Sequence, residues 1–487
     1  MSKTERVTEA PWLAARDRSV ITILLVATFV VILNETALNV ALTSVMTDLH
    51  VDERTVQWLT TAFMLTMAVV IPITGWLLER IPTRAAFILA MSLFTAGTLV
   101  CAVAPTFALV LAGRIVQASG TAIMMPLLMT TIMQLVPPAH RGAVMGNISL
   151  VISVAPALGP TLAGVVLQFS SWRGVFALMV PIGLAMLIGG ALRIANVNEP
   201  VRVPLDVLSI PLTVLGFGGL VYGLSLIGDT GAPAAELATV FSIAIAALIA
   251  FLWRQLLLAR SDRALLDLRA FRHGAFTISV VVMALAMMAL FGTIIMLPLL
   301  LQRALHLPAL SVGLILLPGG LLMGVLGPIV GRLYDRVGAR PLMLPASVLV
   351  AGVFWVLSTI APDTQWWLVL VCHMAMSASF AFMFTPLFTI ALGSLPRQLY
   401  THGSAIVGTV QQLAGALGTA VFVTVFATQS EARRQTGAGV EASLLYGSHL
   451  AFIGAGAVWL LAIVAIAFLR TPEPEAEASH GTERDLD

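Results

Sequence analysis

The chain has 487 residues, of which 59% are apolar and only 10% charged, and its mean hydropathy is +0.98. A soluble protein of this length would carry about 25% charged residues, so the composition excludes a soluble enzyme. The net charge of +2 gives no basic field for nucleic acid, and the two cysteines suggest neither a disulfide framework nor a metal cluster. The sequence therefore predicts an all-α membrane protein.

Fourteen apolar segments are each long enough to cross a bilayer as a helix, which takes about 20 residues. They cover approximately residues 19–41, 56–78, 85–104, 107–133, 143–167, 174–195, 205–227, 236–258, 276–301, 311–331, 341–361, 365–390, 403–427 and 447–469. The segments between and beyond them have at most 19 residues, so no soluble catalytic domain fits. A membrane-embedded enzyme or a channel would need a metal cluster, a nucleophile with its base, or a filter-like repeat, and the sequence offers none of these.

Basic residues indicate the orientation, because cytoplasmic loops hold the excess of arginine and lysine. An inside N-terminus places 20 of the 26 basic residues on the cytoplasmic side and 5 outside, and one, Arg114, lies within a span. Residues 1–18 are therefore expected to form a cytoplasmic tail, and residues 471–487 an acidic, solvated cytoplasmic tail. Both termini are thus predicted to be cytoplasmic.

The first predicted helix contains the one acidic residue that lies deep within a span, Glu35. Burying a carboxylate in lipid is costly, so an intramembrane acid indicates a functional site, and proton coupling is the leading interpretation. The alternative is a structural pair with Arg114 of the fourth helix. Glu35 lies roughly 9 Å inside the end of the first helix and Arg114 roughly 10 Å inside the start of the fourth, so the two share a level. Asn34 and Asn39 are candidates for substrate contacts, with hydrogen bonding between helices as the alternative.

The fourth and fifth helices carry two further motifs. The fourth reads Leu111-Ala-Gly-Arg114-Ile-Val-Gln117-Ala-Ser-Gly120, and the fifth contains Gly146 and then Ala155-Pro-Ala-Leu-Gly159-Pro160-Thr-Leu-Ala163-Gly164. The Gly-Pro pair lacks one side chain and one backbone donor, which predicts close packing or a kink. Gln117 is costly in lipid and is another candidate for a substrate contact, or for a hydrogen bond between helices.

The second half of the chain repeats two motifs of the first half. Gly331-Arg-Leu-Tyr-Asp335-Arg336-Val-Gly338-Ala-Arg340 follows Gly75-Trp-Leu-Leu-Glu79-Arg80-Ile-Pro82-Thr-Arg84 by 256 residues, and Ala416-Leu-Gly418 follows Ala157-Leu-Gly159 by 259. This offset of eight helices predicts two six-helix bundles, 19–195 and 276–470, separated by a linker, 196–275, that contains two inserted helices. Repeated halves that rock about a central site are typical of secondary transporters.

Three polar residues of the second half are additional site candidates. His373 aligns with Arg114 when the halves are superposed on Pro126 and Pro386, and it is a candidate to face Glu35 across a cavity. The alternative for His373 is a satisfied core histidine. Gln411 and Gln412 are candidates for substrate contacts, again with hydrogen bonding between helices as the alternative.

The order and spacing of these motifs resemble the fourteen-helix drug:proton antiporter branch of the major facilitator superfamily, and within it the lincomycin-resistance type of exporter. Glu79 stands where that superfamily usually has Asp, and Asn34 where most relatives of this branch have Asp. The acid at Glu35 is therefore displaced by one residue, which turns it about 100° around the helix.

This resemblance implies a proton-coupled antiporter that exports amphiphilic drugs, with lincosamides among the expected substrates. It further implies alternating access across the bacterial cytoplasmic membrane, a functional monomer, and the proton gradient as the energy source with no cofactor. The alternative is a proton-coupled symporter for a nutrient or metabolite on the same fold.

The resemblance also assigns roles to individual residues. Arg114 would hold Glu35 ionised until a proton or a cationic drug displaces it. Glu79 would meet the start of the thirteenth helix near Thr401-His402-Gly403, where the helix dipole favours an anion. By the repeat, Asp335 would meet the start of the fifth helix near Arg141-Gly142, and the two contacts would close the cytoplasmic side. Arg80, Arg84, Arg336 and Arg340 would take part in this gate, enforce the topology, or do both. Gly146, Gly159, Pro160 and Gly164 belong to the antiporter motif, which is thought to close one side against leak, or in the simpler interpretation kinks the helix.

Overall fold

The structure, a computed structural model, describes residues 13–201, 204–227 and 233–469. The predicted acidic tail, 471–487, lies outside these ranges, and so does most of the predicted tail 1–18. Within the described ranges the regular elements are all helical, and 14 helical segments are long and apolar enough to cross a membrane. The predicted fold class is therefore confirmed.

The helices fall into a first half, an insert and a second half. The first half contains α1 (Ala15–Leu49), α2 (Glu53–Arg80), α3 (Thr83–Val103), α4 (Phe107–Leu135), α5 (Arg141–Phe169) and α6 (Trp172–Arg193). The insert contains α7 (Ser209–Thr213), the π-helical turn η2 (Val214–Gly218), α8 (Gly219–Ile227) and α9 (Ala234–Leu258). The second half contains α10 (Gly274–Arg303), α11 (Ala309–Val337), α12 (Arg340–Leu357), α13 (Trp366–Gly393), α14 (Tyr400–Gln435) and α15 (Val440–Phe468). The segments α7, η2 and α8 together form the seventh span.

The predicted helix ends were the least accurate part of this assignment. α1 continues to Leu49 and α14 to Gln435, each eight residues beyond the predicted end. These extensions contain Asp48 and Glu431, because a hydropathy window finds only the apolar part of a helix, whereas the helix itself continues into the polar region.

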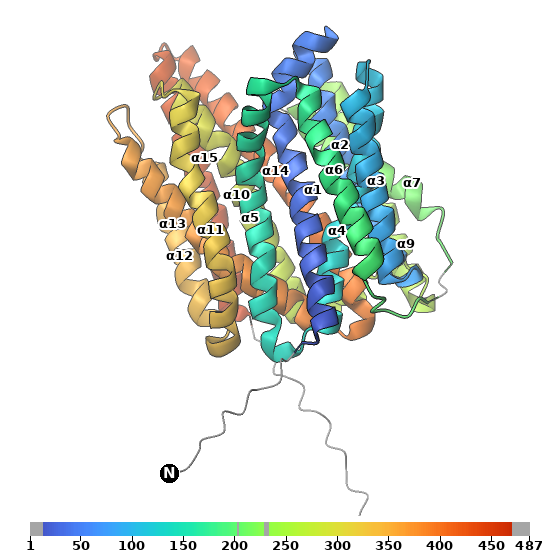
Figure 1. Cartoon of the computed structure of the whole chain (residues 1–487). Coiled ribbons are helices and arrows are strands. Elements are labelled where there is room, and N and C mark those ends of the chain that lie inside the picture. Colours follow the sequence, from blue (N-terminus) through green and yellow to red (C-terminus); the bar gives the residue numbers. More distant parts are fainter. Residues whose placement is uncertain (1–12, 202–203, 228–232, 470–487) are drawn as a thin grey trace, which may run out of the picture.

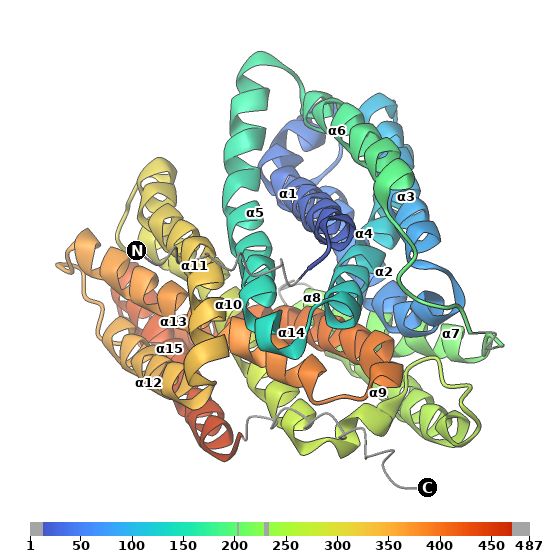
Figure 2. The same ribbon diagram turned by 60° about the horizontal axis from the view of Figure 1, so that its bottom comes forward.

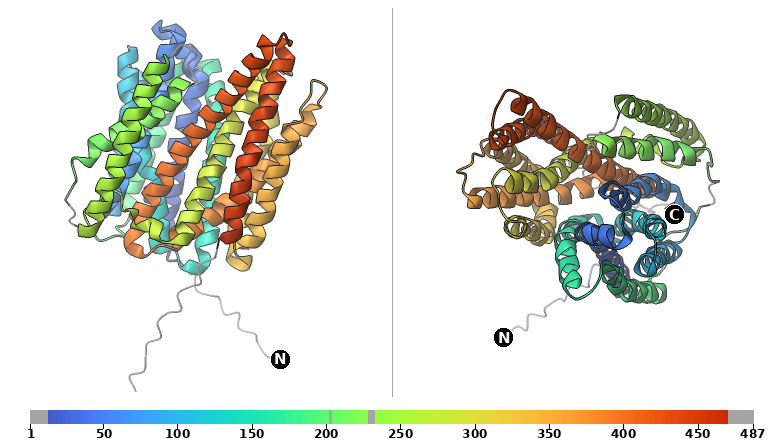
Figure 3. Two further views of the ribbon diagram at one scale, coloured as in Figure 1. Left: turned by 180° about the vertical axis from the view of Figure 1, so that it is seen from behind. Right: turned by 90° about the horizontal axis from the view of Figure 1, so that it is seen from above.

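Helices of each half pack mainly on one another. In the first half α3 packs on α4 and α6, and α1 packs on α5; in the second half α10 packs on α14, and α11 on α13. Figures 1 and 3 show the blue-to-green and the yellow-to-red helices as two groups. The halves meet along α5 with α11 and along α2 with α14, and the insert packs against α2 and α14.

Both described ends of the chain lie at the same end of the molecule (Figure 1). We call this end the terminal face, and the opposite end the far face. α2 and α11 end at the terminal face, where α5 and α14 begin. Figure 2 turns the terminal face towards the viewer.

The insert is anchored at the terminal face by a half-buried ion pair between Asp206 and Arg254. Asp206 accepts hydrogen bonds from Arg254 Nε at 2.7 Å and Arg254 Nη2 at 2.6 Å. These charged hydrogen bonds hold the pKa of Asp206 below its ordinary value. Gln255, fully buried next to Arg254, binds the Ser209 hydroxyl and the backbone N–H groups of Leu265 and Leu266. The start of α7 is therefore fixed to the end of α9.

Candidate functional site

A buried polar network connects α1, α3 and α4. Arg114, only 1% exposed, donates from Nη1 to Gln117 Oε1 at 2.7 Å, one helical turn further along α4. Gln117 Nε2 lies 2.7 Å from both Asn34 Oδ1 and Thr98 Oγ1. We call Asn34, Thr98, Arg114 and Gln117 the α1–α4 network. A charge buried this deeply is tolerated only when hydrogen bonds replace the water it has lost.

The α2 side completes the surroundings of Arg114. Its Nε donates to the Leu59 carbonyl at 3.4 Å, and its guanidinium lies 4.0 Å from the centre of the Phe63 ring. Thr98 and Phe63 were not identified from the sequence, because a single threonine or phenylalanine in an apolar helix carries no signal of its own. Arg114 therefore contacts groups on α2 and α4 and connects to α1 through Gln117.

The predicted direct pairing of Arg114 with Glu35 is not seen in this conformation. Among the described residues, no ion pair and no side-chain hydrogen bond of Glu35 is found, whereas Arg114 binds Gln117 and Gln117 binds Asn34. The reason is the one-residue displacement: Asn34 faces α4 and is 1% exposed, so Glu35 is turned away by about 100°. The hydrogen-bonding interpretation of Asn34 and Gln117 is the one realised here.

Glu35 lies on a polar face of α1 that leads towards the far face. Glu35, Asn39 and Thr43 are spaced by four residues, so they share one side of the helix. Glu35 is half-buried, whereas Asn39 and Thr43 are exposed. Three polar side chains in a row are costly against lipid, which indicates contact with water or a polar ligand along this face.

The Gly-Pro motif of α5 packs directly against the turn of α1 that carries Glu35. A Cβ atom on Gly159 would lie 2.1 Å from Thr36 Oγ1 and 2.8 Å from the Leu33 carbonyl oxygen. Glycine is therefore required at this contact. Pro160 is exposed within the helix, and a Cβ on Gly164 would meet nothing within 4 Å, so Gly164 makes no close contact of this kind.

The internal repeat appears in the structure as an equivalent contact in the second half. A Cβ on Gly418 of α14 would lie 2.3 Å from the Met288 carbonyl oxygen of α10. α10 is the first helix of its half and α14 the fifth, as α1 and α5 are in the first half. The repeated Ala-Leu-Gly segments of the two halves thus make the same type of helix contact.

Asp335 bridges the two halves at the terminal face. Its Oδ1 accepts from the Gly142 N–H at 2.9 Å, and its Oδ2 accepts from the Ala143 N–H at 2.8 Å. These are two of the unpaired N–H groups of the first turn of α5, where the helix dipole favours an anion. The structure therefore places this carboxylate at the helix start expected from the repeat.

Glu79 makes the equivalent bridge between α2 and α14, but to side chains. Its Oε1 accepts from Thr401 Oγ1 at 3.3 Å and lies 3.1 Å from His402 Nε2. Nearby, Arg141 donates to the Val136 and Met133 carbonyl groups and approaches the Tyr400 hydroxyl at 3.4 Å. Thr401 and His402 belong to the helix start at which the sequence analysis expected Glu79. Tyr400 was not indicated as a partner of Arg141, because the two residues are 259 positions apart.

The four arginines predicted near these acids differ in position. Arg80, Arg84 and Arg336 are exposed at the terminal face. Arg340 instead donates to the Leu469 and Ala467 carbonyl groups at 3.0 and 3.1 Å, so it caps the end of α15. The hydrogen bonds found for Arg340 among the described residues therefore stay within the second half.

Glycines bring α5 and α11 into backbone contact beside Asp335. A Cβ on Gly146 would lie 2.4 Å from the Gly327 carbonyl oxygen, and one on Gly331 would lie 2.1 Å from the Gly142 carbonyl oxygen. Each helix thus presents two glycines four residues apart, the small-residue spacing that allows membrane helices to approach closely. The terminal ends of the two halves are therefore in contact in this structure.

The remaining candidates lie away from the α1–α4 network. His373 is 6% exposed and packs against Gly319, where a Cβ would lie 2.4 Å from its ring. His373 thus packs from α13 onto α11, and no contact between it and Glu35 is found among the described residues. Gln411 and Gln412 are half-buried on α14, and no side-chain hydrogen bond of theirs is found in the described ranges.

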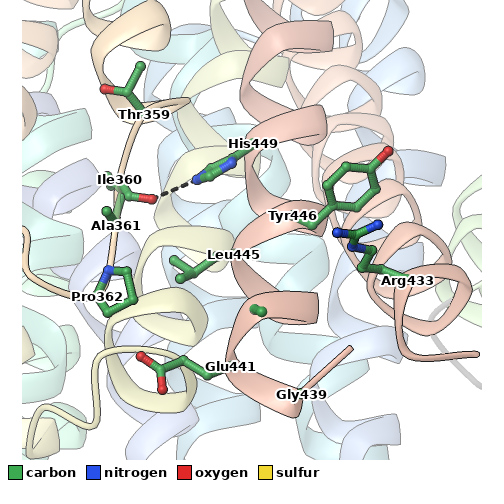
Figure 4. Close-up of a pocket in the computed structure, with 11 residues that line it drawn as sticks. Thr359, Ile360, Ala361, Pro362, Arg433, Gly439, Glu441, Leu445, Tyr446 and His449 are labelled. Atoms are coloured by element: carbon green, nitrogen blue, oxygen red, sulfur yellow. Dashed lines mark hydrogen bonds between the residues drawn. The ribbon is translucent and has the colours of Figure 1, made fainter. Parts of the chain in front are cut away.

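A separate hollow of about 580 Å³ lies at the far face of the second half (Figure 4). Its wall includes His449, whose Nε2 lies 2.6 Å from the Ile360 carbonyl oxygen, and Arg433, whose guanidinium lies 5.4 Å from the Tyr446 ring centre. It is remote in the fold from the α1–α4 network. Across the described residues, no group of three or more His, Cys, Asp or Glu side chains is arranged to hold a metal.

Comparison with known proteins identifies the family. The family model described as "Major Facilitator Superfamily" matches residues 24–419. The chain belongs to the major facilitator superfamily. It is a multi-pass membrane transporter of small molecules, and the α1–α4 network and the terminal-face contacts are parts of a transporter.

Several bacterial relatives of this transporter are drug-resistance proteins. It is 37% identical over 460 residues to the lincomycin resistance protein LmrB of Listeria monocytogenes, covering 93% of this chain and 97% of the relative. The lincomycin resistance protein LmrB of Bacillus subtilis is 36% identical, with 92% and 94% covered. The multidrug export protein EmrB of Haemophilus influenzae is 29% identical, with 81% and 78% covered.

Solved structures share the fold at low sequence identity. The human organic anion transporter MFSD10 superposes with a TM-score of 0.65 at 14% identity, covering 92% of this chain and 99% of that one. The proton:xylose symporter XylE gives a TM-score of 0.63 at 14% identity, with 94% and 96% covered. These similarities concern the architecture alone.

Proposed function

We propose that this transporter is a proton-coupled antiporter that exports amphiphilic drugs, lincosamides among them, across the bacterial cytoplasmic membrane. Support for drug export comes from the lincomycin resistance proteins, which are 36–37% identical over more than 90% of this chain. The observation that carries proton coupling is Glu35, a half-buried acid on the polar face of α1 next to the α1–α4 network. The protein would work as a monomer, with the proton gradient as its energy source.

The orientation in this proposal makes the terminal face cytoplasmic. Cytoplasmic loops of membrane proteins hold the excess of arginine, and Arg80, Arg84 and Arg336 are exposed at the terminal face. Both termini would then be cytoplasmic. The two rocking units would be residues 19–195 and 276–470, with 196–275 as the inserted pair and its linkers.

The conformation fits one step of an alternating-access cycle. The contacts of Glu79 and Asp335 close the terminal face, whereas Asn39 and Thr43 leave the polar face of α1 exposed towards the far face. In this step Glu35 would take up an external proton. Protonation removes the charge of Glu35 and so lowers the free energy needed to take its side chain out of water when the far ends of the helices close.

A revised role for Arg114 follows from its partners. Because Gln117 and the Leu59 carbonyl hold the guanidinium, Arg114 would act on Glu35 through its positive charge and through the position of Asn34, which Gln117 fixes. Asn34 Nδ2 is buried without a hydrogen-bond partner in the described structure, which leaves one donor near Glu35 for water or substrate.

The test is export by a Glu35→Gln variant. In a pump-deficient host, wild type should raise resistance to lincosamides and lipophilic cations, and Glu35→Gln should return it to the level of the empty host. Proteoliposomes should show proton flux on drug addition for wild type only. Glu431→Gln is the matched control, since Glu431 is exposed at the far face, where it accepts from Gln435 Nε2 at 3.3 Å and lies 3.7 Å from Arg434 Nε.

Two results would contradict the proposal. Wild-type export by Glu35→Gln against a pH gradient would remove Glu35 from proton coupling. Proton-driven uptake of a nutrient or metabolite, without drug extrusion, would instead support the alternative symporter on the same fold.

A further inference from the structure

A basic, partly apolar hollow of about 520 Å³ lies at the terminal end of the insert. It is formed where α9 runs into the short helices η3 (Ala259–Ser261) and η4 (Leu268–Arg272). Its lining consists of Leu256, Ala259, Arg260, Leu268, Arg269, Phe271 and Arg272. Figure 2 shows α9, which leads into this hollow, at the margin of the terminal face. The transport site described above uses none of these residues.

Two of the three arginines that line this hollow keep their charge uncompensated. Arg269 is neutralised, because its Nη2 lies 2.5 Å from Asp262 Oδ1 and 2.6 Å from Asp267 Oδ2. Arg260 and Arg272 are exposed, and no acidic side chain lies within 4 Å of either in the described structure. The hollow thus presents two guanidinium groups that are free to bind an anion bidentately.

The apolar part of the hollow faces outward. Leu256 is 55% exposed and Phe271 is 39% exposed, and Trp253, one turn before Leu256, is 66% exposed. Such exposure is favourable only against acyl chains, and a tryptophan at this level is typical of the membrane–water interface. Arginines and apolar side chains therefore meet at the depth where lipid head groups join their acyl chains.

The walls of the hollow are held in place by buried hydrogen bonds. The fully buried Gln255 accepts from the backbone N–H groups of Leu265 and Leu266, and Asp267, 3% exposed, accepts from the Arg269 N–H at 2.8 Å. The loop is thus fixed on the end of α9 before any ligand binds. A preorganised site loses less entropy when it binds its ligand.

We propose that this hollow binds an anionic phospholipid, with Arg260 and Arg272 on its phosphate group and Leu256 and Phe271 against its acyl chains. Basic pockets between helices at the membrane surface are suited to anionic head groups. Free inorganic phosphate could bind the same two arginines, because it carries the same anionic group. Only a phospholipid would also contact Leu256 and Phe271 through its acyl chains. This inference requires only that the chain is embedded in a membrane and does not depend on the transported substrate.

The experiment compares lipid binding by purified full-length protein in detergent. Thermal midpoints are measured with added phosphatidylglycerol, phosphatidylcholine or inorganic phosphate, and the dissociation constant for phosphatidylglycerol is measured by native mass spectrometry. The variant is Arg260→Gln with Arg272→Gln. The matched control is Arg193→Gln with Arg397→Gln, which removes two exposed arginines of the same face outside the hollow.

Phosphatidylglycerol should raise the midpoint of the wild type and of the control, and phosphatidylcholine should not. The Arg260/Arg272 double variant should bind phosphatidylglycerol about 30-fold more weakly, since each arginine near an anionic lipid surface contributes roughly a factor of five. Equal stabilisation of that variant and wild type, or equal loss in the control, would overturn the site. Equal stabilisation of wild type by inorganic phosphate would overturn the assignment to lipid.

Discussion

Removal of the Asp335 carboxylate should open the terminal face. The carboxylate accepts two backbone hydrogen bonds from α5, at 2.9 and 2.8 Å, and both are broken when the halves separate. A hydrogen bond to a charged group contributes about 1.5–3 kcal/mol net, so Asp335→Ala should cost the closed state about 3 kcal/mol. That change increases the population with an open terminal face on the order of 100-fold. Asp335→Asn keeps one acceptor and should have a smaller effect.

A cysteine at position 404 can report this opening. Ser404 is fully buried and accepts from Thr130 Oγ1 of the other half at 3.1 Å, so it becomes accessible only when the halves separate. In a background with Cys101 and Cys372 replaced by alanine, Ser404→Cys should react with a maleimide far faster when Asp335→Ala is present. Asp363→Asn, an exposed acid at the far face, is the control. An unchanged labelling rate with Asp335→Ala would refute the gating argument.

Two further variants test contacts elsewhere in the fold. Gly159→Ala should lower both the thermal midpoint and export, because the added Cβ would lie 2.8 Å from the Leu33 carbonyl oxygen and overpacking costs about 1–3 kcal/mol. Gly164→Ala is the control, since its Cβ would meet nothing within 4 Å, and it should leave both quantities unchanged. Equal effects of the two variants would contradict this account. Asp206→Asn should destabilise the insert by about 1–3 kcal/mol at pH 7 through loss of its bonds to Arg254. Because the pKa of Asp206 is lowered in the folded protein, its stabilising contribution is present above about pH 4 and is lost as the pH falls further. The thermal midpoints of wild type and Asp206→Asn should therefore differ at neutral pH and converge in acid.

Hydropathy was sufficient to predict the spans. The family resemblance predicted the position of Glu79, and the repeat extended that prediction to Asp335. Both signals are local or periodic in the chain. The orientation of Glu35 was not predictable in the same way, because a shift of one residue turns a side chain by about 100°, and which of Asn34 and Glu35 faces α4 depends on how α1 packs. The contact of Tyr400 with Arg141 was likewise not predicted, since neither residue type indicates a partner in the other half of the chain.

α5 provides a physical connection between the proposed proton site and the terminal face. Near its middle, Gly159 contacts the turn of α1 that carries Glu35, and at its start the Gly142 N–H is bound by Asp335. The two contacts are 17 residues apart on one helix, roughly 25 Å. In the proposed coupling α1 moves when Glu35 is protonated, and α5 would move with it, because Gly159 brings the two backbones together without a deformable side chain. The first turn of α5 would then move away from Asp335. Proton uptake at Glu35 and opening of the terminal face would thereby be linked through one rigid-body movement of α5.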